Sequence, residues 1–178
     1  MNSRQLLRIS TTLFEARPKQ VKAVFSPHIF TIGAQWMAER MGVENRSDKH
    51  DHNQLFIYYG LLKYGICVTV FLGAFFLFWH LQPWLIPLSI LVFYLCEIHF
   101  LFLFPLLIDQ VPRPVCASVR MTYRMGLIRT AFTVMHIGLF MVSGLFQYKN
   151  PFKKWHIGCL AIVIWYQHEV RNRLPAYL

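Results

Sequence analysis

Apolar and polar positions are distributed unevenly along this chain. Charged side chains are frequent up to about residue 54, whereas three later stretches, 55–79, 84–108 and 126–146, contain one charged residue each. A helix needs about 20 predominantly apolar residues to cross roughly 30 Å of hydrocarbon. The pattern therefore predicts an all-α membrane protein with transmembrane spans at about 55–80, 84–108 and 126–146.

A fourth span is predicted at about 154–170. Its uninterrupted apolar run covers only residues 157–166, a length that is also typical of a re-entrant or buried segment. Aromatic residues at both ends of the run are typical of interfacial anchors, which allow a short helix to cross. We therefore expect four crossings, with a tight connection at residues 80–84 between the first two.

The region before the first span, residues 1–54, is predicted to be a basic arm that contains one helix and a polar hinge at 44–54. Ser26 can cap a helix that starts at Pro27, and Gly42 suits the position just after its end, so a helix is expected over about 27–41. Its apolar residues recur at three- and four-residue spacing, which is typical of an amphipathic helix on a membrane surface or a partner. They are Ile29, Phe30, Gly33, Trp36, Met37 and Met41. A short basic tail, 171–178, ends the chain.

Residues 1–25 have the composition of a mitochondrial presequence, with five basic residues, several Ser and Thr, and one acidic residue. An equally good interpretation is a retained basic arm that lies on a membrane surface or a neighbouring subunit. No apolar stretch follows the charges, so a secretory signal is excluded.

Composition and charge agree with a membrane location. The chain has 56% hydrophobic, 16% aromatic and 15% charged residues, whereas soluble proteins carry about 25% charged residues. These values exclude a disordered chain, a disulfide-rich secreted module and a conventional cytosolic enzyme. The net charge of +10 flanks the predicted spans, so we do not attribute it to nucleic-acid binding.

The basic residues predict the orientation of the chain in its membrane. Fourteen of the 18 basic residues fall on one side of the predicted topology, and Lys149, Lys153 and Lys154 fall on the other. The remaining one, Lys63, lies within the first predicted span. This asymmetry predicts both termini on the positive side. That side is the matrix if the chain lies in the mitochondrial inner membrane, the preferred location, or the cytoplasm if it lies in a bacterial inner membrane.

Two ionisable residues of opposite charge are predicted to meet inside the membrane. Counted from the positive side, Lys63 is about eight residues deep and Glu97 about eleven. At 1.5 Å per residue the offset is roughly 5 Å, which a lysine side chain can bridge. An interhelical ion pair is favoured over a role in proton transport.

Two histidines, His99 and His136, are predicted to lie at similar depths on adjacent helices. Such a pair could supply the axial ligands of a b-type haem. The favoured interpretation is that each imidazole forms a hydrogen bond to a neighbouring helix, so no cofactor is expected. No metal site is predicted, because His50 and His52 lack further spaced ligands. The four cysteines show no paired spacing that predicts a disulfide framework.

Arginines on the positive side form a candidate site for the phosphates of anionic lipids such as cardiolipin. The same charges would set the topology whether or not a lipid binds. The candidate residues are Arg113, Arg120, Arg124, Arg171 and Arg173. On the first span, Gly65, Thr69 and Gly73 recur every four residues and predict a smooth surface for close helix packing.

These features predict a non-catalytic, multi-pass accessory subunit of a large inner-membrane complex, with other membrane subunits as partners. The respiratory chain and ATP synthase are the preferred assemblies, and no catalytic residue is assigned. One alternative is a small b-haem redox subunit linked to quinone through His99 and His136. A further alternative is a small transporter or lipid enzyme, for which only Lys63, Glu97 and the histidines offer a polar path.

Overall fold

The computed structural model describes residues 1–16, 29–43, 49–147, 150 and 152–172, which form helices and no strand. The helices are α1 (Ser3–Ala16), α2 (Ile29–Met41), α3 (Lys49–Leu81), η1 (Pro83–Leu85), α4 (Leu88–His99), α5 (Leu103–Ile108), α6 (Pro114–Arg124), α7 (Leu127–Leu145), α8 (Lys153–Trp165) and η2 (Tyr166–Val170).

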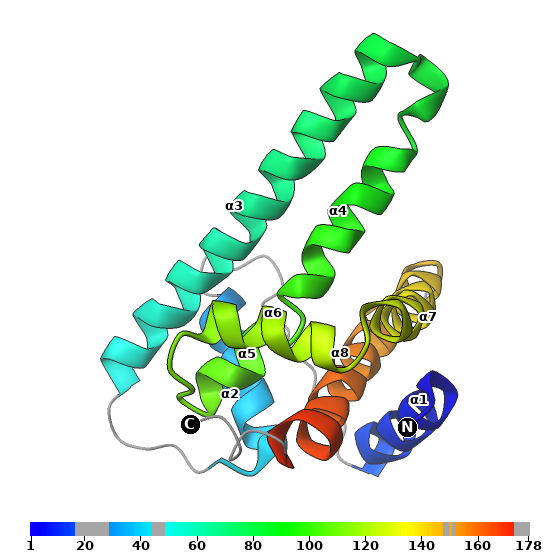
Figure 1. Ribbon diagram of the computed structural model, residues 1–178. Helices are drawn as coiled ribbons and strands as arrows, with labels where there is room; N and C mark the ends of the chain where they lie inside the picture. Colours follow the sequence, from blue (N-terminus) through cyan, green and yellow to red (C-terminus); the bar gives the residue numbers. More distant parts are fainter. Residues whose placement is uncertain (17–28, 44–48, 148–149, 151, 173–178) are drawn as a thin grey trace.

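Helices α3 and α4 form a hairpin that projects from the other helices, which together make up a base (Figure 1). The predicted tight connection between the first two spans is present as the short helix η1. The residue just before η1 is fixed by a hydrogen bond, in which the backbone N–H of Gln82 donates to the carbonyl of Phe78 at 2.9 Å. We call this end of the hairpin the tip, and the end that meets the base the foot.

Among the residues that the structure describes, three helical segments are long and apolar enough to cross a membrane: Gln54–Leu81, Pro83–Ile108 and Leu127–Leu145. They correspond to the first three predicted spans. The second is broken, because α4 ends at His99 and α5 begins only at Leu103. Helix α7 is strongly foreshortened in the view that displays the hairpin along its length, so its axis is steeply inclined to the hairpin (Figure 1).

The structure does not confirm the fourth predicted span, 154–170, as a crossing. This segment forms α8, 13 residues long, and the π-helical turn η2. Eight of the 13 residues of α8 are buried, because α1, α2 and α7 pack around it. A helix enclosed by protein is apolar on all sides, which explains why α8 resembles a membrane span in sequence.

Helix α1 packs on α8 of the same chain, although the sequence predicted an arm on a membrane surface or a neighbouring subunit. Leu6, Leu7 and Phe14 are buried in the core of the base, while Arg4 and Arg8 are exposed. The apolar residues of α1, which are spaced three and four apart, thus pack against other helices of the same chain. The rest of the predicted arm, residues 17–25, lies outside the described residues.

Helix α2 is likewise part of the base. Trp36 and Met41 are buried in the same core as α8, so at least part of its predicted apolar face packs within the chain. The prediction for its end is confirmed, because Gly42 adopts a φ of +68°, a conformation that favours glycine. Ser26 and Pro27, the predicted start, lie outside the described residues.

Two glycines allow α7 and α8 to approach closely as an antiparallel pair. A Cβ atom at Gly144 would lie 2.5 Å from the Cβ of Lys154, and one at Gly158 would collide with the side chain of Met141. Both positions therefore leave no room for a side chain unless the contacting side chains of the neighbouring helix move.

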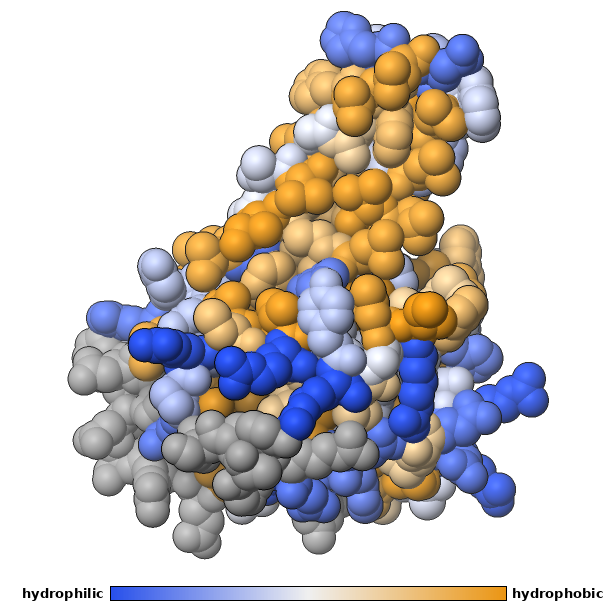
Figure 2. Space-filling view, viewed as in Figure 1, coloured by the Kyte–Doolittle hydropathy of each residue, from blue (hydrophilic) through white to orange (hydrophobic). Residues whose placement is uncertain are grey.

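The surface is divided between an apolar hairpin and a base that carries most of the hydrophilic side chains (Figure 2). Only 11% of the apolar window of α3 is buried within the protein. Large apolar side chains on both hairpin helices are therefore uncovered, among them Leu61, Phe76, Leu77, Ile90 and Leu91. An exposed apolar surface of this extent is typical of membrane contact or of partner binding.

Candidate functional site

Helix α6 is fastened to the foot of the hairpin by two buried hydroxyl groups. The last carbonyls of α4 have no partners within their own helix, because the helix ends at His99. Ser118 Oγ donates to the carbonyl of His99 at 2.8 Å, and Thr122 Oγ1 donates to the carbonyl of Ile98 at 3.2 Å. These bonds fix α6 where the hairpin leaves the base.

The opposite face of α6 carries Arg120 and Arg124, and Arg113 immediately precedes the helix; all three are exposed. Figure 2 shows strongly hydrophilic side chains gathered across the foot of the hairpin, directly below its apolar surface. Two members of the predicted lipid-binding set thus share one helix face, and a third lies at the start of the same helix. Arg171 does not lie on α6, and Arg173 lies outside the described residues.

Arg171 takes part in an internal cluster with Asp109 and Tyr166. Its guanidinium Nη2 lies 3.1 Å from Asp109 Oδ1, and the Tyr166 hydroxyl donates to Asp109 Oδ2 at 2.7 Å. Burial and this hydrogen bond raise the pKa of Tyr166 above its usual value, so the hydroxyl stays a donor. The cluster joins the end of α5 to the end of η2.

Aromatic side chains are exposed near both ends of the hairpin. Trp79 and Trp84 lie near the tip, and Tyr58 and Tyr123 near the foot. Tyr58 and Trp79 are 21 residues apart on α3, which corresponds to about 32 Å along a helix. This separation matches the roughly 30 Å of a bilayer core, and Trp and Tyr are enriched at both of its interfaces.

The structure brings Lys63 and Glu97 together inside the hairpin. Lys63 Nζ lies 3.2 Å from Glu97 Oε1, and the two side chains are 9% and 36% exposed. The ammonium group also lies over the rings of Tyr64 and Phe104, at 5.1 and 5.8 Å from their centroids. Carboxylate and ring faces together compensate the buried charge.

Next to this pair lie two thiols that the sequence analysis did not connect. Cys67 Sγ and Cys96 Sγ are 3.7 Å apart, and both cysteines are free. Cys67 follows Lys63 by one helical turn, and Cys96 immediately precedes Glu97. The contact between Cys67 and Cys96 could therefore have been predicted from the same helix alignment that predicted the contact between Lys63 and Glu97.

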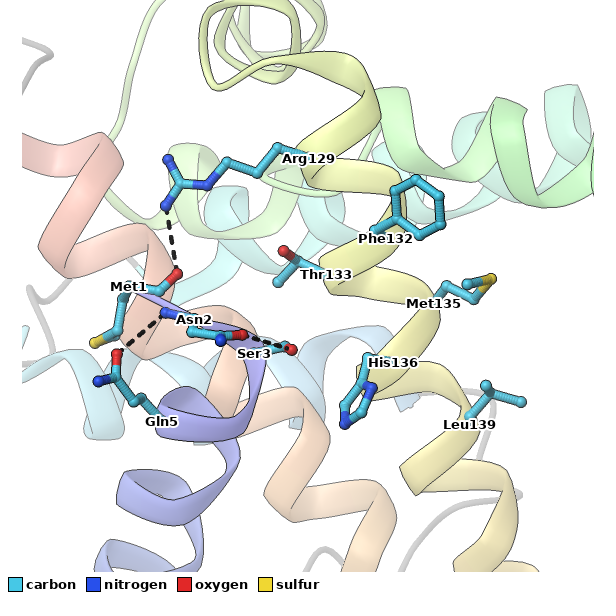
Figure 3. A pocket seen from close by; sticks show the side chains of 10 residues that line it. All are labelled: Met1, Asn2, Ser3, Gln5, Arg129, Phe132, Thr133, Met135, His136 and Leu139. Atoms are coloured by element: carbon cyan, nitrogen blue, oxygen red, sulfur yellow. Dashed lines mark hydrogen bonds between the residues drawn. The ribbon is translucent and has the colours of Figure 1, made fainter.

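The structure gives His99 and His136 different surroundings and does not bring them together. His99 Nδ1 lies 2.7 Å from the carbonyl of Leu95 and His99 Nε2 lies 3.3 Å from the Tyr123 hydroxyl. Since a carbonyl only accepts, Nδ1 donates and Nε2 accepts from Tyr123. His136 instead lines a cavity against α1 (Figure 3). The facing imidazoles that an axial haem pair requires are not formed.

This cavity, which was not predicted from the sequence, lies between the start of α1 and the exposed side of α7 (Figure 3). It is open to the surface and has a volume of about 700 Å³. Its wall combines polar and apolar side chains. The lining residues are Met1, Asn2, Ser3, Gln5, Arg129, Phe132, Thr133, Met135, His136 and Leu139.

At the rim of the cavity, Glu169 joins η2 to α1 and α7. Its Oε1 accepts from the amino group of Met1 and lies 3.2 Å from Arg129 Nη2, which also donates to the Met1 carbonyl. Burial alone raises the pKa of Glu169, but the hydrogen bond from Met1 and the charge of Arg129 outweigh it, and the pKa lies below its usual value of 4.5.

Within the described ranges, no group of three or more His, Cys, Asp or Glu side chains is placed to hold a metal ion. His50 and His52 fall in the first turn of α3. No protein-family model, no curated protein and no solved structure matches this chain.

Proposed function

We propose that this chain is a membrane-anchored, non-catalytic structural subunit of a larger membrane complex. The observation that carries the proposal is the projecting hairpin, whose apolar surface is uncovered and whose aromatic ends are one bilayer core apart. In this arrangement the hairpin crosses the bilayer and returns, while the core of the base remains at one surface.

Helix α7 supplies the third apolar segment, and its inclination to the hairpin suits an oblique entry into the bilayer. Its exposed apolar residues recur at alternating three- and four-residue spacing, so they form one stripe along the helix. The stripe consists of Ile128, Phe132, Met135, Leu139, Val142 and Phe146. In our proposal this stripe faces lipid, while α1 and α8 cover the other side of α7.

The arginines of α6 lie at the level where the hairpin would enter the lipid. Arg120 and Arg124 are exposed on one face of α6 and Arg113 is exposed just before its start, and a cluster of arginines at this level suits the phosphates of anionic lipids such as cardiolipin or phosphatidylglycerol. Basic residues accumulate on the matrix or cytoplasmic side of inner membranes. We therefore assign the base to that side of a mitochondrial or bacterial inner membrane.

A smooth ridge on α3 supports the proposal of a partner subunit. Gly65, Thr69 and Gly73 are exposed, and a Cβ atom at either glycine would meet no other atom within 4 Å. The Thr69 hydroxyl donates to the carbonyl of Gly65 at 2.8 Å and so needs no outside partner. Small residues at this spacing let a second membrane helix approach closely, and we propose that this helix belongs to a subunit of a respiratory-chain or ATP synthase assembly.

Native gel electrophoresis of the detergent-solubilised protein tests this proposal. We expect the wild type to migrate within a complex much larger than 21.1 kDa, and the double substitution Gly65→Leu/Gly73→Leu to release it. The matched control is Gly138→Leu on α7, where a Cβ also meets nothing within 4 Å. The proposal fails if the wild type runs as a free chain, or if the control releases it equally.

A further inference from the structure

The wall of the cavity between α1 and α7 contains a hydroxyl group, that of Thr133, for which the described part of the protein supplies no partner. Thr133 is only 8% exposed, and its Oγ1 makes no hydrogen bond to any described residue. Figure 3 shows its side chain directed into the cavity. A hydroxyl group that faces a cavity without a partner in the protein is available to a polar ligand at this end of the cavity.

Further polar groups surround the same space. His136 comes from α7, Ser3 is the first residue of α1, and Asn2 immediately precedes it (Figure 3). The N-terminal end of this 14-residue helix carries partial positive charge. Arg129 stands at the rim, where its charge is shared with Glu169. A helix N-terminus beside an arginine favours an anion over a cation.

The remaining wall of the cavity is apolar and faces outward. Phe132 and Leu139 are 64% and 65% exposed, and Met135 lies between them on the same stripe of α7. A ligand that fills the cavity must therefore be polar at one end and apolar along its length. Since α7 has the length and composition of a membrane helix, such an amphiphile would enter from the bilayer.

We propose that this cavity binds one glycerophospholipid, with its phosphodiester beside Thr133, His136 and the start of α1. One acyl chain then lies along Phe132, Met135 and Leu139 toward the bilayer interior. This inference rests on the proposed membrane anchoring and extends it, because the site is distinct from the exposed arginines of α6. The Thr133 hydroxyl donates a hydrogen bond to a phosphate oxygen and orients the headgroup.

Photo-crosslinking in vesicles tests the site. The full chain is reconstituted into phosphatidylglycerol vesicles in which a fraction of the lipid carries a diazirine on one acyl chain, and labelled peptides are mapped by mass spectrometry. We expect label on the peptide that contains Phe132–Leu139 and, as an internal reference, on the hairpin around Phe76. Loss of one hydrogen bond to a charged group should lower the labelling of the cavity by about tenfold in Thr133→Val.

Two further variants distinguish loss of the Thr133 hydroxyl from general damage to the fold. Thr133→Ser keeps a hydroxyl and should retain labelling. Thr130→Val removes a fully buried hydroxyl of α7 that has no partner and does not line the cavity, so labelling should remain. Equal cavity labelling in Thr133→Val and Thr130→Val would overturn the inference, as would loss of labelling in Thr130→Val.

The same experiment separates failure of the inference from failure of the anchoring. If the hairpin is labelled but the cavity does not respond to Thr133→Val, the lipid site is refuted and the anchoring stands. If the hairpin is not labelled, the anchoring itself is refuted. An excess of inorganic phosphate should leave cavity labelling unchanged, and strong competition by free phosphate would show a soluble anion as the ligand instead.

Discussion

At the scale of single residues, the hairpin contains the ion pair of Lys63 and Glu97. Lys63 lies about 8 Å along α3 from Tyr58, the exposed aromatic residue near the foot. Lys63 and Glu97 could be matched from sequence because both are isolated charges in apolar runs, and antiparallel helices bring similar depths together. The rings above the ammonium group could not be predicted in this way. Tyr64 follows Lys63 directly on α3, but Phe104 reaches Lys63 from α5, beyond the break that ends α4.

We expect Lys63→Met to lower the free energy of unfolding by about 2 kcal/mol. The cost of leaving one member of a buried ion pair alone is about 3–5 kcal/mol, and it is reduced here because Glu97 is partly exposed and its charge is screened. Denaturant titration in detergent, with the double substitution Lys63→Met/Glu97→Gln, measures the coupling. The double variant should recover part of the loss, and purely additive effects would contradict the pairing.

The pKa of Glu169 leads to a pH-dependent prediction. Because the folded pKa lies below its usual value of 4.5, the ionised carboxylate stabilises the fold above pH 4.5, and this stabilisation is lost as the pH falls through the folded pKa. At neutral pH, Glu169→Gln should therefore melt at a lower temperature than the wild type, and the difference should shrink in acid. A difference that stays constant from neutral to acidic pH would contradict this prediction.

At the scale of elements, sequence periodicity located the apolar helices well but could not distinguish lipid from protein around them. The run at 157–166 predicts a span, yet it lies in α8, the enclosed helix of the base. Helix α1 shows the same ambiguity, because an amphipathic stripe looks alike whether it covers a membrane or a neighbouring helix. Only the packing of α1, α2 and α7 around α8 resolves this.

The contact between α7 and α8 gives a prediction at this scale. Gly158→Leu should lower the free energy of unfolding by about 2 kcal/mol, because overpacking a close contact typically costs 1–3 kcal/mol. The new side chain would collide with Met141. Gly138→Leu, which meets nothing within 4 Å, is the control and should be neutral or slightly stabilising, because Leu favours helix more than Gly does. Thermal melting in detergent compares the two, and equal losses would count against the close approach.

At the scale of the whole molecule, the chain combines an apolar hairpin with a base that has its own core. That core contains residues from α1, α2, α5, α6, α7 and α8, so the base depends on segments from both ends of the chain. The position of α6 connects the two parts, because its buried hydroxyls hold the end of α4 while its arginines remain exposed. In our proposal this helix marks the membrane surface.

The central claim is that the hairpin crosses the bilayer with its tip on the side opposite to the base. Cys116 is exposed on α6, and Gln82 is exposed at the tip, so the native cysteine and a Gln82→Cys substitution in a Cys116→Ser background report on the two ends. Labelling with a membrane-impermeant maleimide is compared in membrane vesicles of both orientations. We predict that each cysteine reacts in one orientation only, and that the two orientations differ. Reaction of both cysteines from the same side would contradict the crossing.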